Sequence, residues 1–256
     1  IEMNYLVMEA LIKSQNSLMD SMQSRIKRYN QREMDQRLFV DLLTGNIAHD
    51  EEENYRIKEQ RWPVPPYQII YIEVDRIKQK LHELREEEAQ ERIERIENLI
   101  REAFTGEQVV VLSNNGTFQC ILKRTGDKEI GADYFEAIQR EICEKTGYMA
   151  TIGVSRTEDT YKRFGQAYQD ARDAVEIAVC QNLESRVLCI EDAGFWKILK
   201  KISKQDMCRE FVEEKLNAFI EYDQENEREL LETLEALVNN LGARNVTENA
   251  LHLHRN

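Results

Sequence analysis

The sequence has few of the residues that interrupt helices. Its 256 residues include three prolines and ten glycines, and all three prolines lie within residues 62–66. Because proline fixes φ and removes a backbone donor, this distribution favours a helix-rich protein with one marked break at that stretch. No apolar run reaches the roughly 18 residues that span a bilayer, and the first residues lack the basic-then-apolar layout of a signal peptide. We therefore expect a cytoplasmic protein without membrane contact, and we take the chain as part of a longer protein.

Positive charge is also scarce. The 48 acidic side chains against 35 basic ones give a formal net charge of −13. Such a field repels phosphate backbones and anionic membranes, so any contact with nucleic acid must be made by a small local patch. The hydrophobic fraction of 41% is enough to bury a core, which excludes a chain that is disordered throughout.

Motifs for metal and cofactor chemistry are missing. The sequence contains no CxxC pair, P-loop, GxGxxG, GxSxG or HExxH pattern. His252 and His254 have a metal-like spacing, but no third ligand near them completes a site. We therefore expect no metal, no cofactor, no catalytic residue, and free thiols in a reducing cytoplasm. The five cysteines are Cys120, Cys143, Cys180, Cys189 and Cys208.

Residues 1–62 form the first part of the chain and are predicted to be helical. Eight residues recur at alternating spacings of three and four, as do the a and d positions of a heptad repeat. They are Tyr5, Met8, Ile12, Gln15, Met19, Met22, Ile26 and Tyr29. The pattern predicts a coiled-coil-like helix that joins two chains into a homodimer, although an amphipathic helix packed on its own domain remains an alternative. The expected dimer contacts are Met8, Ile12, Met19, Met22 and Ile26.

A second, short helix is predicted after this repeat. Its apolar residues are Leu38, Phe39, Leu42 and Leu43. Gly45 is suited to end it, because glycine adopts the left-handed conformation that often follows the last turn of a helix.

Residues 67–194 alternate between strand-like and helix-like patterns. Strands are expected at 67–75, 107–113, 118–122, 149–154 and 187–190, and helices at 77–104, 133–145 and 164–179. A hairpin turn is predicted at Asn114-Asn115-Gly116, since Asn and Gly tolerate positive φ. Alanines in the last of these helices allow it to approach a sheet closely. The order of elements indicates an α+β fold with an antiparallel-containing α/β sandwich of the ferredoxin-like kind.

This sandwich resembles the GGDEF-type nucleotide cyclase fold. Its first strand ends in Glu73-Val74-Asp75-Arg76-Ile77-Lys78, similar to the Asp-x-Asp-x-Phe-Lys that holds metal in active cyclases. Glu73 and Asp75 point to the same face of a strand and could share a cation. The hairpin, Asn114-Asn115-Gly116-Thr117-Phe118, lacks the acids of the Gly-Gly-Asp/Glu-Glu-Phe hairpin. We therefore expect a degenerate GGDEF-like domain that does not perform two-metal phosphoryl transfer.

Residues 195–256 show no strand pattern and are predicted to be all-helical. An apolar face from Leu230 to Leu241 predicts a helix, and Gly242 stands where a C′ residue would. The stretch that follows has features of a helix-turn-helix: Asn245 can cap a short helix, and the second helix would open near His254.

The sequence also resembles the PucR/CdaR family of bacterial transcriptional regulators. The resemblance is carried by Phe39-Val-Asp-Leu-Leu-Thr-Gly45, the strand ending at Asp75, Thr151-Ile-Gly-Val-Ser155, Ala167-Tyr-Gln-Asp-Ala-Arg172, Glu221-Tyr-Asp223, Leu230-Leu-Glu-Thr-Leu234 and His252-Leu-His-Arg-Asn256. The last group is similar to the start of the family's recognition helix, which we expect to be truncated at Asn256. The resemblance implies a dimer that binds operator DNA and responds to a small-molecule effector. The implied DNA contacts are Thr247, His254, Arg255 and Asn256.

Two alternatives stay open. The first is a divergent nucleotide-binding or nucleotide cyclase domain that uses Glu73 and Asp75, which turnover of GTP or ATP with a divalent metal would reveal. The second is a purely structural dimerisation module that binds no ligand.

Overall fold

The computed structural model describes residues 2–46, 50–74, 85–104, 107–114, 116–124, 131–181, 187–203, 205–226 and 230–239. The chain divides into two units, Ile1–Lys197 and Ile198–Asn256. None of the helices in the described ranges combines the length and the hydropathy of a membrane span.

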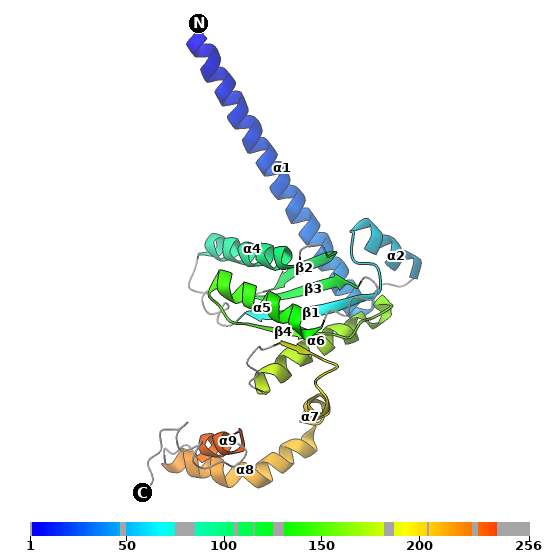
Figure 1. Cartoon of the computed structure of the whole chain (residues 1–256), viewed down its shortest axis with the longest axis vertical. Helices are drawn as coiled ribbons and strands as arrows, with labels where there is room; N and C mark the ends of the chain where they lie inside the picture. Colours follow the sequence, from blue (N-terminus) through cyan, green and yellow to red (C-terminus); the bar gives the residue numbers. More distant parts are fainter. Residues whose placement is uncertain are drawn as a thin grey trace. The chain divides into compact units, whose positions relative to one another are not determined.

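The chain begins with one long helix, α1 (Glu2–Thr44), drawn in blue in Figure 1. The apolar residues around Leu38 and Leu43 form the end of α1, so the predicted break before a second helix is wrong. Residues 30–37 contain no glycine or proline and consist mostly of good helix formers, so nothing there interrupts the backbone hydrogen bonds. Gly45 follows with a φ of +70° and ends the helix as predicted. A short helix, α2 (Asp50–Glu59), then precedes the prolines.

A five-stranded sheet forms the centre of the first unit (Figure 1). Its strands are β1 (Tyr67–Val74), β2 (Val109–Asn114), β3 (Thr117–Lys123), β4 (Ala150–Val154) and β5 (Val187–Cys189). They lie in the order β2-β3-β1-β4-β5, with antiparallel pairing except between β4 and β5. Pairing of Asn114 with Thr117 confirms the predicted hairpin, and β5 lies at an edge of the sheet.

Three helices alternate with the strands along the chain. They are α4 (Glu86–Ala103), α5 (Ala132–Thr146) and α6 (Phe164–Cys180). A 3-10 turn (Tyr161–Arg163) leads into α6. The predicted order of strands and helices is therefore confirmed, while the start of the predicted helix 77–104 lies partly outside the described residues. Gly147 ends α5 in the left-handed conformation, as its sequence position indicates.

Hydrophobic cores cover both faces of the sheet, because successive residues of a strand point to opposite sides. Ile70 and Ile72 of β1 point into a core shared with α4 and α5. Ile69 points the other way, into a core built with α1 and α6. Leu38 and Leu42 of α1 are buried in this second core, so the end of the long helix is packed into the α/β domain.

Helix α6 approaches the sheet very closely at Gly153 of β4. A Cβ atom at this position would collide with the backbone oxygen of Ala171 and would lie 2.8 Å from the backbone nitrogen of Val175. Ala167, Ala171 and Ala174 are fully buried on the same helix. The close approach that the alanines predict is confirmed, and it also requires a glycine on the strand.

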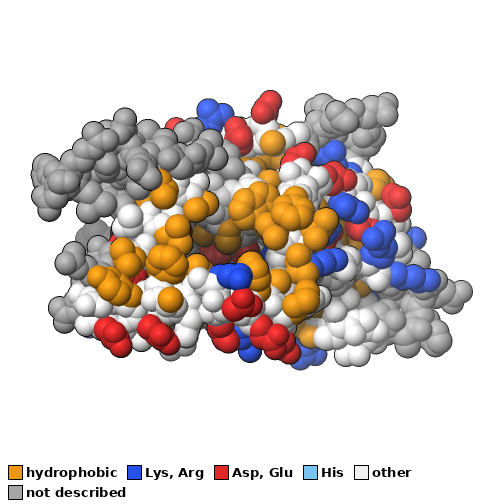
Figure 2. All heavy atoms as spheres, turned by 90° about the horizontal axis from the view of Figure 1, so that it is seen from below, with side chains coloured by type: hydrophobic (Ala, Val, Ile, Leu, Met, Phe, Trp, Pro, Cys, Tyr) orange, Lys and Arg blue, Asp and Glu red, His pale blue; other side chains and the backbone are white. Residues whose placement is uncertain are grey.

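The second unit is helical where it is described. Helix α7 (Phe195–Ser203) begins in the first unit and leads into α8 (Asp206–Asn226) and α9 (Leu230–Asn239). The carboxylate of Asp223 accepts hydrogen bonds from the backbone N–H groups of Leu230 and Leu231, at 2.8 and 2.9 Å, and so caps α9. Exposed hydrophobic side chains gather on the face drawn in Figure 2, and α8 itself exposes Met207 and Phe211.

Substituting Gly153 is expected to destabilise the fold. In Gly153→Ala the new methyl group meets backbone atoms of α6, which must move away from the sheet at a cost of about 1–3 kcal/mol. Urea unfolding followed by circular dichroism measures this loss. The matched control is Gly131→Ala, where a Cβ meets no atom within 4 Å. Equal unfolding midpoints for Gly153→Ala and the wild type would contradict the close packing.

Candidate functional site

Strand β1 ends beside the β2–β3 hairpin. Glu73 pairs with Thr117 of β3 on one side and with Thr151 of β4 on the other. Paired residues of neighbouring strands share a face of the sheet. Tyr71, two residues earlier in β1, packs against the core of α1 and α6, so Glu73 lies on that side. Asp75, the other predicted carboxylate, is outside the described residues.

The polar groups of the hairpin next to Glu73 are bonded to one another, whereas the buried hydroxyl of Thr151 has no hydrogen-bond partner among the described residues. The Thr117 hydroxyl donates to the backbone oxygen of Asn114 at 2.7 Å and accepts from the Gln119 side-chain amide at 3.0 Å. Thr117, Gln119 and Thr151 are all buried. The hairpin end therefore uses its hydroxyl and amide groups to hold its own turn together.

This arrangement limits the chemistry that the described residues offer. Among them, no group of three or more His, Cys, Asp or Glu side chains is placed to hold a metal ion. Phosphoryl transfer by two metals needs several acidic ligands gathered at one point. The described part of the site instead presents Glu73 beside neutral threonine side chains.

The other predicted site residues fall into two groups. Thr247, His254, Arg255 and Asn256, the implied DNA contacts, are outside the described residues, as are His252 and Gly242. The predicted dimer contacts lie on α1. Ile12, Met19, Met22 and Ile26 are each more than half exposed, whereas the side chain of Met8 is not described. Their role in dimer formation stays a prediction.

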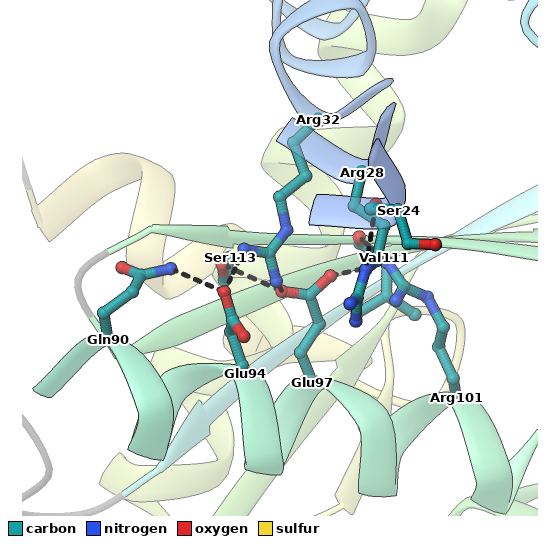
Figure 3. Close-up of polar contacts among 9 residues, drawn as sticks. All are labelled: Ser24, Arg28, Arg32, Gln90, Glu94, Glu97, Arg101, Val111 and Ser113. Atoms are coloured by element: carbon teal, nitrogen blue, oxygen red, sulfur yellow. Dashed lines mark hydrogen bonds and ion pairs between the residues drawn. The ribbon is translucent and has the colours of Figure 1, made fainter. Parts of the chain in front are cut away.

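A buried carboxylate connects α1 to the α/β domain (Figure 3). Glu97 of α4 has only 1% of its surface exposed. Its Oε2 accepts from Nη2 of Arg32 on α1 at 2.7 Å, and its Oε1 accepts from Nη2 of Arg101 on α4 at 2.5 Å. The second guanidinium nitrogen of Arg32 donates to Glu94 at 2.9 Å. Arg32 therefore bridges two turns of α4, and the charge of Glu97 is compensated from two helices.

The same cluster reaches the edge strand β2. Arg101 donates to the backbone oxygen of Val111 at 3.1 Å, and the Ser113 hydroxyl donates to Glu97 at 3.3 Å. Ser113 directly precedes Asn114, the last residue of β2 before the hairpin turn. Helix α1, helix α4 and the hairpin strand are thus joined through one carboxylate.

A second polar contact on α1 lies one turn further along. The Trp62 indole N–H donates to Asp35 at 2.7 Å, and the Gln31 amide donates to the same oxygen at 3.1 Å. Burial raises the pKa of Asp35 above its ordinary value of 3.8, and the hydrogen bonds from Trp62 and Gln31 oppose that rise. Asp35 ties the proline-rich stretch that begins at Trp62 to the long helix.

Sequence reasoning missed both contacts. Glu97 lies in the predicted helix 77–104, which contains many charged residues. Its residue type does not distinguish it from the other acids of that helix. A usable signal exists in its position between Ile96 and Ile100, because an acid inside the apolar stripe of a helix must find a buried partner. The partner, Arg32, is 65 residues away in the chain, so no local pattern identifies it.

The cysteines of the described residues are free, as predicted. Burial raises the pKa of Cys120 far above its ordinary value, and burial together with Asp192 and Glu191 raises the pKa of Cys189 to about 11. Both thiols are therefore protonated at neutral pH and poor nucleophiles.

The comparisons with known proteins point to one domain type. A family model for GGDEF-like domains matches residues 45–177. No curated protein matches the chain.

Solved structures that are similar to the chain include two GGDEF-type domains. The GGDEF domain of DgcB from Caulobacter crescentus, in complex with c-di-GMP, is 15% identical with a TM-score of 0.37, covering 49% of this chain and 78% of that one. The active GGEEF domain of a diguanylate cyclase from Vibrio cholerae is also 15% identical, with a TM-score of 0.39, covering 60% of this chain and 95% of that one.

Lowering the pH is expected to increase the contribution of Asp35 to stability. Because the pKa of Asp35 is raised in the folded protein, the folded state binds more protons than the unfolded state between the ordinary value of 3.8 and the folded pKa. The free energy of unfolding contributed by Asp35 therefore rises as the pH falls through the folded pKa, and it levels off below 3.8.

The variant Asp35→Asn keeps an acceptor for Trp62 and removes the titration. Urea unfolding of both proteins at a series of pH values measures the difference. The free energy of unfolding of the wild type minus that of Asp35→Asn is expected to grow as the pH is lowered from about 7 to about 4. A difference that stays constant, or shrinks, over this range would show that Asp35 is not buried in this way.

Proposed function

The chain belongs to the family of GGDEF-like domains, and on this premise we propose that it is a transcriptional regulator of the PucR/CdaR type, not a nucleotide cyclase. In this proposal the protein binds operator DNA as a homodimer through a C-terminal helix-turn-helix. It responds to a metabolic small molecule and uses no cofactor and no catalytic residue. The GGDEF-like domain serves as a scaffold between the long helix and the DNA-binding end.

The observation that carries the non-catalytic part is the hairpin beside Glu73. A cyclase needs acidic ligands there, whereas the chain has Asn114, Thr117 and a glycine, and the Thr117 hydroxyl is engaged with the turn itself. Thr151, on the other side of Glu73, is a further neutral residue. These neighbours favour a domain that has kept the fold and lost the metal-binding acids.

The DNA-binding part rests on the sequence and on the helices before it. His252-Leu-His-Arg-Asn256 resembles the start of a recognition helix of this family. In the second unit, Asp223 fixes the first turn of α9 by accepting the N–H groups of Leu230 and Leu231. This cap supports a defined helix pair on which a helix-turn-helix can be built.

The test is DNA selection with the full-length gene product. Random duplexes that bind the protein are sequenced, and affinity for the selected site is measured by fluorescence anisotropy between about 50 and 200 mM salt. An inverted-repeat site is expected, with affinity that falls steeply as the salt concentration rises. Arg255→Gln is expected to weaken binding about tenfold or more, because it removes a contact at the start of the recognition helix.

The matched control is Arg209→Gln, which removes the same charge from an exposed position on α8 and is expected to change the affinity less than about twofold. Equal effects of the two variants, or the absence of any selected sequence, would contradict the proposal. Incubation with GTP and a divalent metal tests the alternative. A product that disappears in Glu73→Gln would show a working cyclase.

A further inference from the structure

Helix α1 carries an apolar stripe that its own chain leaves exposed. Ile12 is 51% exposed and Ile26 is 61% exposed, and the residues between them at heptad spacing, Met19 and Met22, are similar. Tyr29 continues the stripe. A single helix of this kind gains little stability alone in water, because most helical stability in proteins comes from packing of an apolar face. We call Ile12, Gln15, Met19, Met22, Ile26 and Tyr29 the seam.

The seam faces away from the domain to which α1 is anchored. Each residue of an α-helix turns the side-chain direction by about 100°. Leu42, which is buried in the domain core, therefore lies about 160° around the helix from both Met22 and Ile26. Asp35, which bonds Trp62, also lies on the side opposite Ile26. A partner helix can thus pack along the seam without displacing any contact that holds α1 to its own domain.

The area of the seam suits a second copy of the same helix. Six side chains that each expose on the order of 100 Å² offer about 600 Å² per chain, close to the roughly 800 Å² per partner of a stable interface. The alternating spacings of three and four are self-complementary, since a and d residues of one helix fit between those of an identical helix. We propose that two chains pair along the seam as a parallel, in-register, two-stranded coiled coil. The proposal rests on the dimer of the proposed function and gives that dimer its geometry.

Branching of the seam residues favours the parallel dimer. The a positions are Ile12, Met19 and Ile26, of which the two isoleucines are branched at Cβ, and the d positions Gln15, Met22 and Tyr29 carry no such branch. Parallel two-stranded coiled coils typically have β-branched residues at a positions and residues without a branch at Cβ at d positions.

Gln15 decides the orientation more strongly. In a parallel, in-register pair the two Gln15 amides face each other and can share a hydrogen bond. In the antiparallel register that overlaps the whole repeat from Tyr5 to Tyr29, Gln15 faces Met19, which leaves the amide without a partner at a cost of about 1–3 kcal/mol for each buried group. A single polar residue within an apolar seam is a known way to fix register.

Charge gives a weaker preference in the other direction. Arg25, Lys27 and Arg28 lie near the domain end of the seam, so a parallel pair brings two basic stretches to the same level. Only Arg25 flanks the seam, and all three side chains are exposed to solvent, where each pair of like charges costs a few tenths of a kcal/mol and is screened by salt. Pairing of the Gln15 amides outweighs this repulsion.

The structure also sets where the coil ends. The next a position after Ile26 is Glu33, which is paired with Arg37 within the same helix at 2.8 Å. Arg32 points to Glu94 and Glu97 of its own domain. The seam therefore stops at Tyr29, and the two helices separate where each joins its own α/β domain.

Disulfide cross-linking tests orientation and register together. In Met22→Cys, a parallel in-register coil places the two new thiols opposite each other, and mild oxidation is expected to form covalent dimers roughly tenfold faster than in the control. The control is Ser24→Cys, an exposed position of the same helix outside the seam. Wild-type protein measures the background from native cysteines such as Cys180, which is exposed. Dimers are counted on non-reducing gels.

The outcomes separate the geometry from the dimer and from DNA binding. If Met22→Cys cross-links no faster than Ser24→Cys, whereas a mixture of Ile12→Cys and Met22→Cys chains does, the pair is antiparallel and the proposal is overturned. If light scattering at about 50 µM protein shows a monomer, the chain does not form the proposed dimer. Selection of an operator is scored independently, so failure of the coil and failure of the regulator proposal give different results.

A second variant, Gln15→Leu, is expected to raise the melting temperature and to lose the uniform dimer, because the residue that fixes the register is gone.

Discussion

A carboxylate that is almost fully buried needs charge partners of its own, and in this protein that requirement joins the parts of the first unit. Glu97 is 1% exposed and is compensated by Arg32 from α1 and Arg101 from α4. Removing a carboxylate from water costs several kcal/mol of free energy. The two guanidinium groups and the Ser113 hydroxyl offset this cost, and the contribution of Arg32 requires that α1 stays in place. The long helix is therefore held to the domain by an interaction that tolerates little displacement.

This anchoring has a consequence for how the protein can work. The seam that we propose as the dimer contact and the hairpin that stands where a cyclase carries its acids are connected through Glu97 and its hydrogen bond from Ser113. A displacement of α1 at Arg32 would therefore alter the contacts of Ser113, which precedes the last residue of β2. Because the Thr117 hydroxyl is bonded to the backbone of the turn, it helps the hairpin to hold its own conformation.

The sequence allowed the local features to be predicted and left the long-range ones hidden. The order of strands and helices along the chain, the Asn114–Gly116 turn and the helix end at Gly45 follow from periodicity and from glycine conformations, which are local properties. The continuous course of α1 was missed, because two different apolar faces of one helix read as two helices. The Glu97 cluster was missed because Arg32 and Glu97 are far apart in the chain. Residues 240–256, which carry the predicted DNA contacts, lie outside the described residues.

The central claim is that Arg32 and Glu97 interact directly and hold α1 on the domain, and a double-mutant cycle measures it. The free energies of unfolding of Arg32→Ala, Glu97→Gln, the double variant and the wild type give the coupling energy between the two side chains. The account predicts a coupling of at least about 1.5 kcal/mol, because the hydrogen-bonded ion pair joins Arg32 to a carboxylate that is only 1% exposed. A coupling within about 0.3 kcal/mol of zero would mean that the two side chains act independently, and would contradict the account.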